Sequence, residues 1–171
     1  MAFQPVGALR QASLRALRRL AWSLVMATIR RRFPEVPVVG CEQLAAELAA
    51  DGPAPVLVDA RSDEEFAVSR LAGARRLATV EAVAAAGLEL NRPIVAYCSV
   101  GYRSARLARA LRRAGYRDVR NLEGSLFRWA NLGLPLEGAP PGQRPVHPFH
   151  PLWEGLLEPP VTAADSAQKG W

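Results

Sequence analysis

Cys98 is the residue of this sequence that is best placed to do chemistry. It directly follows the apolar run 94–97, which is typical of a buried parallel strand, and it precedes a helix expected over residues 104–114. Ligands of open α/β sheets bind outside the carboxyl ends of the strands. Loop N–H groups and the positive end of a helix form an anion cradle there and favour a thiolate. The pattern therefore predicts a nucleophilic cysteine held in its own anion-binding loop.

The loop after Cys98 has a composition that suits this role. It contains Ser99, Val100, Gly101, Tyr102, Arg103 and Ser104. Gly101 permits the positive φ of a tight turn. Arg103 suits bidentate contacts, so we expect it to pair with an anionic donor, with a nearby carboxylate or with both. Tyr102 either gates the loop or is simply exposed. The alternative is that Cys98 is a buried structural thiol. The complete Cys-x-x-Gly-x-Arg-Ser run argues against this alternative.

The run from Cys98 to Ser104 resembles the active-site loop of the rhodanese sulfurtransferases. Residues 56–66 are similar to the family's Asp-x-Arg-x-x-x-Glu-Phe segment, and residues 115–129 are similar to its closing Gly-Tyr … Trp pattern. The resemblance covers about residues 36–137 in the family's order. The sequence departs from the pattern at four positions, where Gly, His, Pro and a second Gly are usual: Ser69, Arg70, Ala72 and Ser125.

The resemblance implies a rhodanese-like α/β fold, a five-stranded parallel sheet with helices on both faces. It implies a sulfurtransferase that takes sulfane sulfur from thiosulfate or a persulfide, through a persulfide on catalytic Cys98, to cyanide or to a small or protein thiol. The amides from Ser99 to Arg103 would stabilise the anionic sulfur. Asp59 and Arg61 would support the loop as a structural pair. No cofactor is implied, and two histidines and two cysteines are too few to predict a metal site.

Two other classes of protein compete with this interpretation. Cysteine phosphatases also place a cysteine and an arginine around an anion cradle, with a loop one residue longer that fits a tetrahedral phosphate. Here four residues separate Cys98 from Arg103, and the smaller ring better suits a single sulfur atom. A non-catalytic rhodanese-like binding or scaffold module, in one version at a membrane surface, is the second alternative. Such modules usually lack the cysteine that this chain retains.

Charge and composition divide the chain into three segments. Residues 1–35 carry seven arginines against Glu35 alone, whereas residues 36–137 have a net charge of +1 and residues 138–171 of −1. The first segment is predicted to be a basic arm with an amphipathic helix over residues 9–29. By the resemblance, residues 36–137 are expected to form the rhodanese-like domain. Residues 138–171 are a proline-rich irregular tail, whose Phe149 and Trp153 are expected to dock on the core or the arm.

Short strands alternate with helices in the domain, which favours parallel pairing. Strands are expected over 36–39, 56–59, 76–78, 94–97 and 118–121. Helices are expected over 42–50, 64–69, 81–86, 104–114 and 125–132. Cys41 falls at the N-cap of the first of these helices, outside any anion cradle, and is expected to be a structural thiol of low reactivity.

The predictions about partners and cellular location depend on the arm, residues 1–35. Its longest apolar run, residues 20–29, is shorter than the roughly 20 residues that span a bilayer, and we expect a cytoplasmic protein. The arginine-rich start also fits an organellar transit peptide, which leaves that compartment open. Residues 9–29 fit a peripheral membrane contact and packing on a partner helix or on the domain itself equally well. Nucleic acid is not an expected partner, because aromatic residues do not interleave with the arginines.

Overall fold

The computed structural model describes residues 6–138, 146–147, 153 and 155–158, with side chains from residue 13 onward. Within these residues the chain forms one parallel five-stranded sheet in the order β1-β5-β4-β2-β3. The strands are β1 (Val38–Val39), β2 (Val56–Asp59), β3 (Arg75–Arg76), β4 (Ile94–Tyr97) and β5 (Val119–Leu122). The expected five-stranded parallel sheet is therefore confirmed, with β4 at its centre.

The helices follow the expected pattern, with ends that differ by a few residues. They are α1 (Val6–Arg32), α2 (Cys41–Ala49), α3 (Asp63–Val68), α4 (Val80–Ala85), α5 (Tyr102–Arg113) and α6 (Ser125–Asn131). The largest difference is in α1, which extends beyond both ends of the expected range 9–29. It continues into a basic last turn, Arg30 to Arg32, whose charges are favourable at the negative end of a helix.

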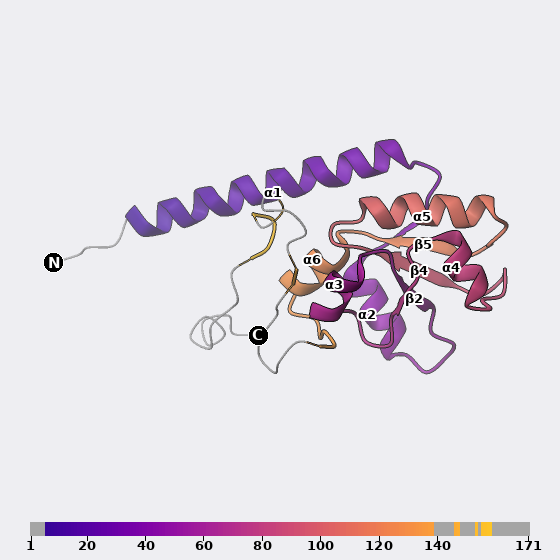
Figure 1. Ribbon diagram of the computed structural model, residues 1–171. Helices are drawn as coiled ribbons and strands as arrows, with labels where there is room; N and C mark the ends of the chain where they lie inside the picture. The colour runs from indigo at the N-terminus through magenta and orange to yellow at the C-terminus, as the bar shows by residue number, and fades with distance from the viewer. Residues whose placement is uncertain (1–5, 139–145, 148–152, 154, 159–171) are drawn as a thin grey trace.

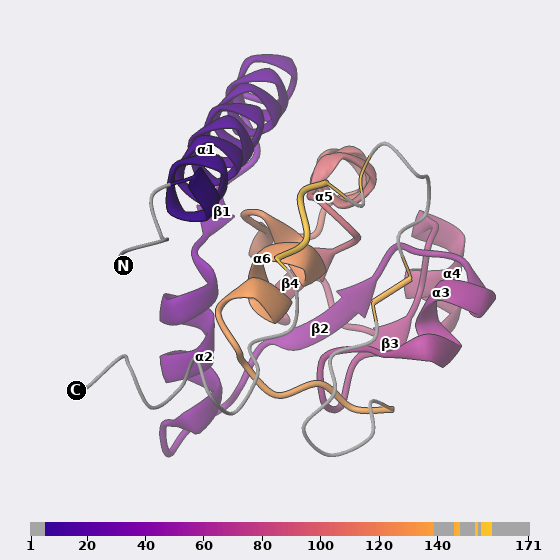
Figure 2. The same cartoon turned by 90° about the vertical axis from the view of Figure 1, so that its left-hand side faces the viewer.

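Alternate residues of the central strands point into two separate cores. On one face, Val58 and Ile94 pack with α4, α5 and the end of α1. On the other face, Leu57 and Val95 pack with α2 and α6. Figure 1 shows α1 and α5 running along one side of the sheet and α2 along the other, and Figure 2 gives the view turned by 90°. Helices on both faces are thus confirmed.

The register of β2 and β4 sets the position of the site. Asp59 and Tyr97, the last residues of these two strands, are direct partners in the parallel ladder. The chain leaves both strands at the same edge of the sheet. Cys98 follows β4 at once, and Arg61 lies two residues beyond β2.

The second half of α1 packs on the domain. Ile29, at 6% exposed, and Phe33, at 3%, belong to the core on the α5 side. The Phe33 ring makes an edge-to-face contact with Tyr102, with ring centroids 5.2 Å apart. The sequence predicts an arm outside the domain over residues 1–35 and leaves packing of its helix on the domain open, and the structure shows that packing for Ile29 and Phe33. The segment boundaries themselves stay predictions.

The described part of the tail fills the angle between α1 and α6. Leu156 is buried against Phe127 and the loop residue Val100. Its carbonyl accepts hydrogen bonds from Trp22 Nε1 at 3.2 Å and from Asn131 Nδ2 at 2.9 Å. Trp153 packs in the same cluster, as expected for a docked aromatic patch. Phe149 lies outside the described residues.

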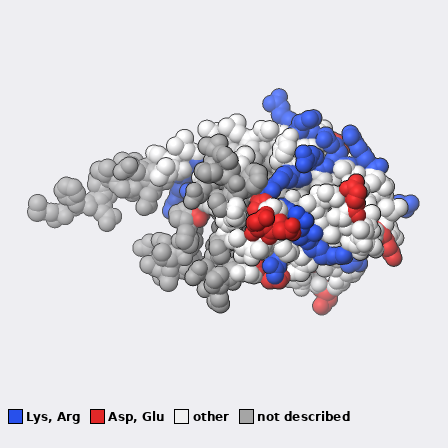
Figure 3. Space-filling view, in the orientation of Figure 1, with Lys and Arg blue, Asp and Glu red and all other residues white. Residues whose placement is uncertain are grey.

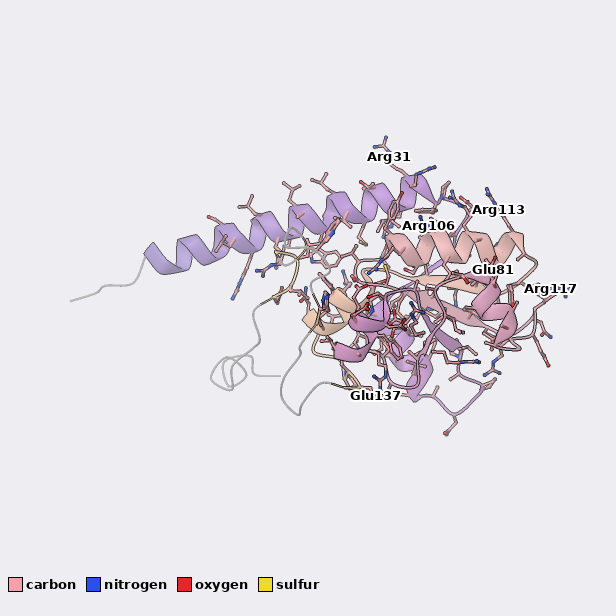
Figure 4. All side chains as sticks on the ribbon, in the orientation of Figure 1. Arg31, Glu81, Arg106, Arg113, Arg117 and Glu137 are labelled. Carbon is pink, nitrogen blue, oxygen red and sulfur yellow. The ribbon has the colours of Figure 1, made fainter. Side chains whose placement is uncertain are left out.

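Helix α1 also carries exposed apolar and basic side chains. Leu14, Leu17, Leu20 and Leu24 are each between 58% and 62% exposed. Basic side chains gather over the end of α1 and over α5 (Figure 3), where Figure 4 places Arg31, Arg106 and Arg113. None of the helices in the described residues combines the length and apolar character needed to span a bilayer. The contact of residues 9–29 with a membrane surface or a partner helix stays a prediction.

Candidate active site

Cys98 lies at the start of the loop that joins β4 to α5, with 1% of its surface exposed. The N–H of Gly101 donates to Cys98 Sγ at 3.1 Å. Gly101 has φ of 111°, in the left-handed region, which directs its N–H back toward the sulfur and disfavours any residue with a Cβ. The next residue, Tyr102, begins α5, so the sulfur also lies beside the positive end of a helix. Among the described contacts, the sulfur accepts this one amide hydrogen bond; anion binding by the loop stays a prediction.

A buried carboxylate, Glu65 on α3, organises the other side of the loop. Arg103 donates two hydrogen bonds of 2.7 Å to its two carboxylate oxygens. The Ser99 hydroxyl donates to the same carboxylate at 3.0 Å and accepts from Arg103 at 2.9 Å. Of the roles considered for Arg103, the pairing with a nearby carboxylate is thus present in the structure. The pair ties α3 to both ends of the Cys98 loop.

The pKa values of Glu65 and Arg103 are both shifted in the direction that favours the ion pair. Burial alone would raise the pKa of Glu65, but hydrogen bonds and the charge of Arg103 outweigh it and lower the pKa to about 2. Burial alone would lower the pKa of Arg103, but Glu65 and the negative charge of a Cys98 thiolate raise it. Both groups are therefore ionised at neutral pH.

Glu65 lies in the segment 56–66 that resembles the family pattern, but it was not predicted as a site residue. Its local signal was a capping box: the Ser62 Oγ accepts from the Glu65 N–H, and the Glu65 carboxylate accepts from the Ser62 N–H. Such a box predicts a helix start. The contact with Arg103 bridges 38 positions of sequence and depends on the sheet register, so no local pattern reveals it.

Two polar residues, Asn121 on β5 and Ser125 on α6, hydrogen-bond to the loop. Neither was predicted as a site residue. Asn121 accepts from the Ser104 hydroxyl at 2.7 Å and donates to the Gly101 carbonyl at 3.2 Å. Ser125 accepts from the Cys98 N–H at 3.2 Å and donates to the Leu122 carbonyl at 3.0 Å. Together they satisfy buried backbone groups at both ends of the loop.

Ser125 stands where the resembling family has a second glycine, and its backbone explains that preference. Its φ is +50°, a left-handed conformation that costs a residue with a Cβ roughly 1–2 kcal/mol. The hydroxyl offsets this cost through its two buried hydrogen bonds. The departure noted in the sequence thus adds a polar contact to the Cys98 backbone.

Asp59 and Arg61 form the expected pair and lie fully buried behind the loop. The Arg61 guanidinium donates to both Asp59 oxygens at 2.7–3.0 Å and to the Ser69 carbonyl at 2.6 Å. Both side chains have zero exposure. Arg61 also lies over the ring of Tyr97, with 5.8 Å between its Cζ and the ring centroid. Through these contacts the two side chains stabilise the end of β2 against β4.

Cys41 occupies a different environment from Cys98. The N-cap of α2 is Gly40, so the expected N-cap position of Cys41 was wrong by one residue. Cys41 is fully buried, and its thiol donates to the Glu123 carbonyl at 3.5 Å. Burial raises the pKa of the Cys41 thiol to about 12. A thiol that stays protonated at neutral pH is a poor nucleophile.

A pocket of about 340 Å³ opens beside Cys98, between the loop and α1. Its lining includes Ser99, Tyr102 and Arg103 from the loop side. Five of the predicted residues, from Cys98 to Val100 with Tyr102 and Arg103, thus line one cavity. Gly101, Ser104, Asp59 and Arg61 do not line it. In the described residues no group of three or more His, Cys, Asp or Glu side chains is arranged to hold a metal ion.

Comparison with known proteins places the domain. The model of a family described as a rhodanese-like domain matches residues 41–132. A sulfurtransferase of Allochromatium vinosum is 33% identical over 99 residues, which cover 57% of this chain and 92% of that protein. A tRNA sulfurtransferase of Desulfurococcus amylolyticus is 29% identical over 121 residues, which cover 71% of this chain and 24% of that protein. The match thus spans about a quarter of the length of the second relative.

A solved structure shows the same fold. The crystal structure of the Alr3790 protein from Anabaena sp. superposes with a TM-score of 0.54 at 27% identity, and the match covers 58% of this chain and 91% of that chain. Helix α1 (Val6–Arg32) lies outside the residues that the family model matches.

Proposed function

Because this chain belongs to the rhodanese-like domain family, we propose that it is a sulfurtransferase in which Cys98 carries the transferred sulfur. The donor is thiosulfate or a persulfide, and the acceptor is a thiophile such as cyanide or a thiol. Relatives that bear the name sulfurtransferase support the reaction class.

One observation carries the proposal. The sulfur of Cys98 accepts a hydrogen bond from the Gly101 amide, at the positive end of α5 and at the wall of a pocket. A hydrogen-bond donor aimed at sulfur stabilises a thiolate and the terminal anion of a persulfide. The second thiol, Cys41, is fully buried at the start of α2, donates to the Glu123 carbonyl, and has a pKa raised to about 12 by burial.

The reaction is a double displacement. The Cys98 thiolate attacks the outer sulfur of thiosulfate, a new S–S bond forms, and sulfite leaves with the electron pair of the broken S–S bond. The acceptor then attacks the outer sulfur of the Cys98 persulfide. The S–S bond breaks, its electron pair returns to Sγ, and thiocyanate is the product when the acceptor is cyanide.

The Glu65–Arg103 pair is assigned a positioning role in this mechanism. Arg103 is held by Glu65 and Ser99, and its positive charge lies near Cys98. It favours a negative charge on the sulfur without leaving its partners. The loop geometry is thus set before substrate arrives, which lowers the cost of reorganisation during reaction.

Intact mass spectrometry of the full chain tests the proposal. After incubation with thiosulfate and removal of excess donor, the mass is expected to rise by about 32 Da, one sulfur atom, and cyanide should reverse the gain. Cys98→Ser should abolish the gain, and Cys41→Ser, the matched control on a buried thiol, should retain it. A folded protein whose Cys98 takes sulfur from neither thiosulfate nor an organic persulfide would contradict the proposal. That result would favour the non-catalytic binding module instead.

A further inference from the structure

The pocket beside Cys98 has walls that differ from its base. Its base is the Cys98 loop, which supplies the thiol and the polar groups already described. Its walls are apolar and come from two distant segments: Leu24, Val25 and Ile29 of α1, and Trp153 of the tail, with Val100 between them. A sulfur-bearing substrate that reaches Cys98 through this pocket therefore contacts hydrocarbon on most sides.

Charge in the pocket is already neutralised. Apart from the Cys98 sulfur, Arg103 is the one charged group among the described residues that line the pocket, and its guanidinium makes a bidentate ion pair with Glu65. The one hydroxyl on the α1 wall, that of Thr28, donates to the Leu24 carbonyl at 2.8 Å. A polar or charged substrate body would lose hydrogen bonds to water here with few partners to replace them.

The α1 wall lies outside the residues that the family model matches. The rhodanese-like match begins at residue 41, whereas the wall residues of α1 lie between positions 24 and 29. The wall is held in place by buried Ile29 and Phe33 and by the hydrogen bond from Trp22 to Leu156. A built wall over the reacting sulfur is suited to select substrates.

We propose that this pocket binds the apolar body of a thiol acceptor, so that the protein transfers sulfur preferentially to aliphatic or aromatic thiols over small hydrophilic ones. The inference rests on the sulfurtransferase function proposed above. The acceptor thiolate attacks the outer sulfur of the Cys98 persulfide, and a new S–S bond forms. The bond to Sγ breaks with its electron pair returning to Cys98, and the acceptor leaves as an alkyl or aryl persulfide.

A homologous series of acceptors measures the contribution of the pocket. The full chain is loaded with sulfur, and its discharge by ethanethiol, propanethiol, butanethiol, pentanethiol and hexanethiol is followed by intact mass. The thiols differ little in intrinsic reactivity, so differences in rate report the contact of the chain with the pocket. Burial of each added methylene should raise the second-order rate constant about two- to fourfold. A rate constant that does not change along the thiol series would overturn the inference.

Two substitutions of nearly equal volume alter the wall in opposite directions. Val25→Thr places a hydroxyl on the wall and should reduce the increase in rate constant per methylene. Thr28→Val removes a hydroxyl from the wall and should enlarge that increase. Ser23→Ala is the matched control: Ser23 makes the same backward hydrogen bond as Thr28, to the Arg19 carbonyl at 3.0 Å, but lies outside the pocket. The control should leave the series unchanged. Equal effects of all three would mean that α1 acts through helix stability and would overturn the inference.

A binding measurement separates this inference from the proposed function. Adding 1-hexanol, which cannot accept sulfur, to the unloaded protein should shift the NMR signals of Val25, Thr28 and Val100 with saturation. Shifts at these residues in a protein whose Cys98 never takes up sulfur would leave the apolar site standing and refute the sulfurtransferase proposal. A protein that takes up sulfur but shows neither these shifts nor a slope in the thiol series would refute the apolar acceptor alone.

Discussion

Replacing Glu65 by glutamine should destabilise the protein at neutral pH and reduce its sensitivity to acid. Glu65 is 2% exposed and receives both hydrogen bonds of the Arg103 fork. Its pKa falls from 4.5 to about 2 in the folded protein. One pKa unit corresponds to about 1.4 kcal/mol, so ionised Glu65 contributes about 3 kcal/mol to the free energy of unfolding.

The sign of the pH dependence follows from the direction of that shift. The folded-state pKa lies below the unfolded value, so the contribution is fully present above about pH 4.5 and is lost as pH falls through about 2. Urea unfolding of the wild type and Glu65→Gln between pH 7 and pH 2 measures it. At pH 7 the variant should be less stable by about 3 kcal/mol, and the two proteins should converge toward pH 2.

The chain contains a matched control on its surface. Arg120 makes the same bidentate contact with Glu47, at 2.8–2.9 Å, but these side chains are 21% and 31% exposed. An exposed ion pair contributes about 1 kcal/mol or less, so Glu47→Gln should change stability by no more than that. If the two glutamine variants lose equal stability, or if Glu65→Gln keeps the acid sensitivity of the wild type, the pair does not brace the loop as argued.

Three further predictions concern loop length, backbone strain and the packing of α1. Inserting one residue between Cys98 and Arg103 should slow sulfur transfer in a cyanide assay, while robust hydrolysis of an aryl phosphate by the unmodified protein would refute the argument from ring size. Ser125→Ala should be less stable in urea than Ser125→Gly by about 1 kcal/mol, because both variants lose the hydroxyl and only alanine keeps the left-handed strain. Equal stability of the two variants would show that φ at this position carries no cost. Phe33→Ala should cost about 3–5 kcal/mol in urea unfolding, against less than about 0.5 kcal/mol for Leu17→Ala on the exposed face, and equal small losses would show that α1 does not share the core.

The sheet could be predicted from sequence because its signals are local. The runs that form β2 and β4 are short, apolar and bounded by turns, and both were predicted with their observed ends. Parallel pairing followed from the helices between the strands. The edge strands were less certain in their bounds, since β1 and β3 are only two residues long. Where a strand is that short, neighbouring strands set its ends more than its own residues do.

The cysteine loop was predictable for the same reason, and its supports were not. Cys98, Gly101 and Arg103 lie within six positions, so one motif contains them. Glu65, Asn121 and Ser125 reach the loop from β5 and two helices across many positions of sequence. Their types are common at helix starts and in turns, which gave each of them an ordinary local explanation. Contacts of this kind depend on register and become visible once the strands are paired.

The role of α1 is the point at which sequence reasoning and structure differ most in their consequences. A charge count separates residues 1–35 from a nearly neutral domain, and this favoured an arm outside the chemistry. Charge reports the exposed side of a helix, however, whereas packing depends on its other side. Ile29 and Phe33 on that side are buried in the core, and Val25 lines the pocket at Cys98. A segment outside the family match can therefore leave the reaction class unchanged and still determine which molecules reach the reacting sulfur.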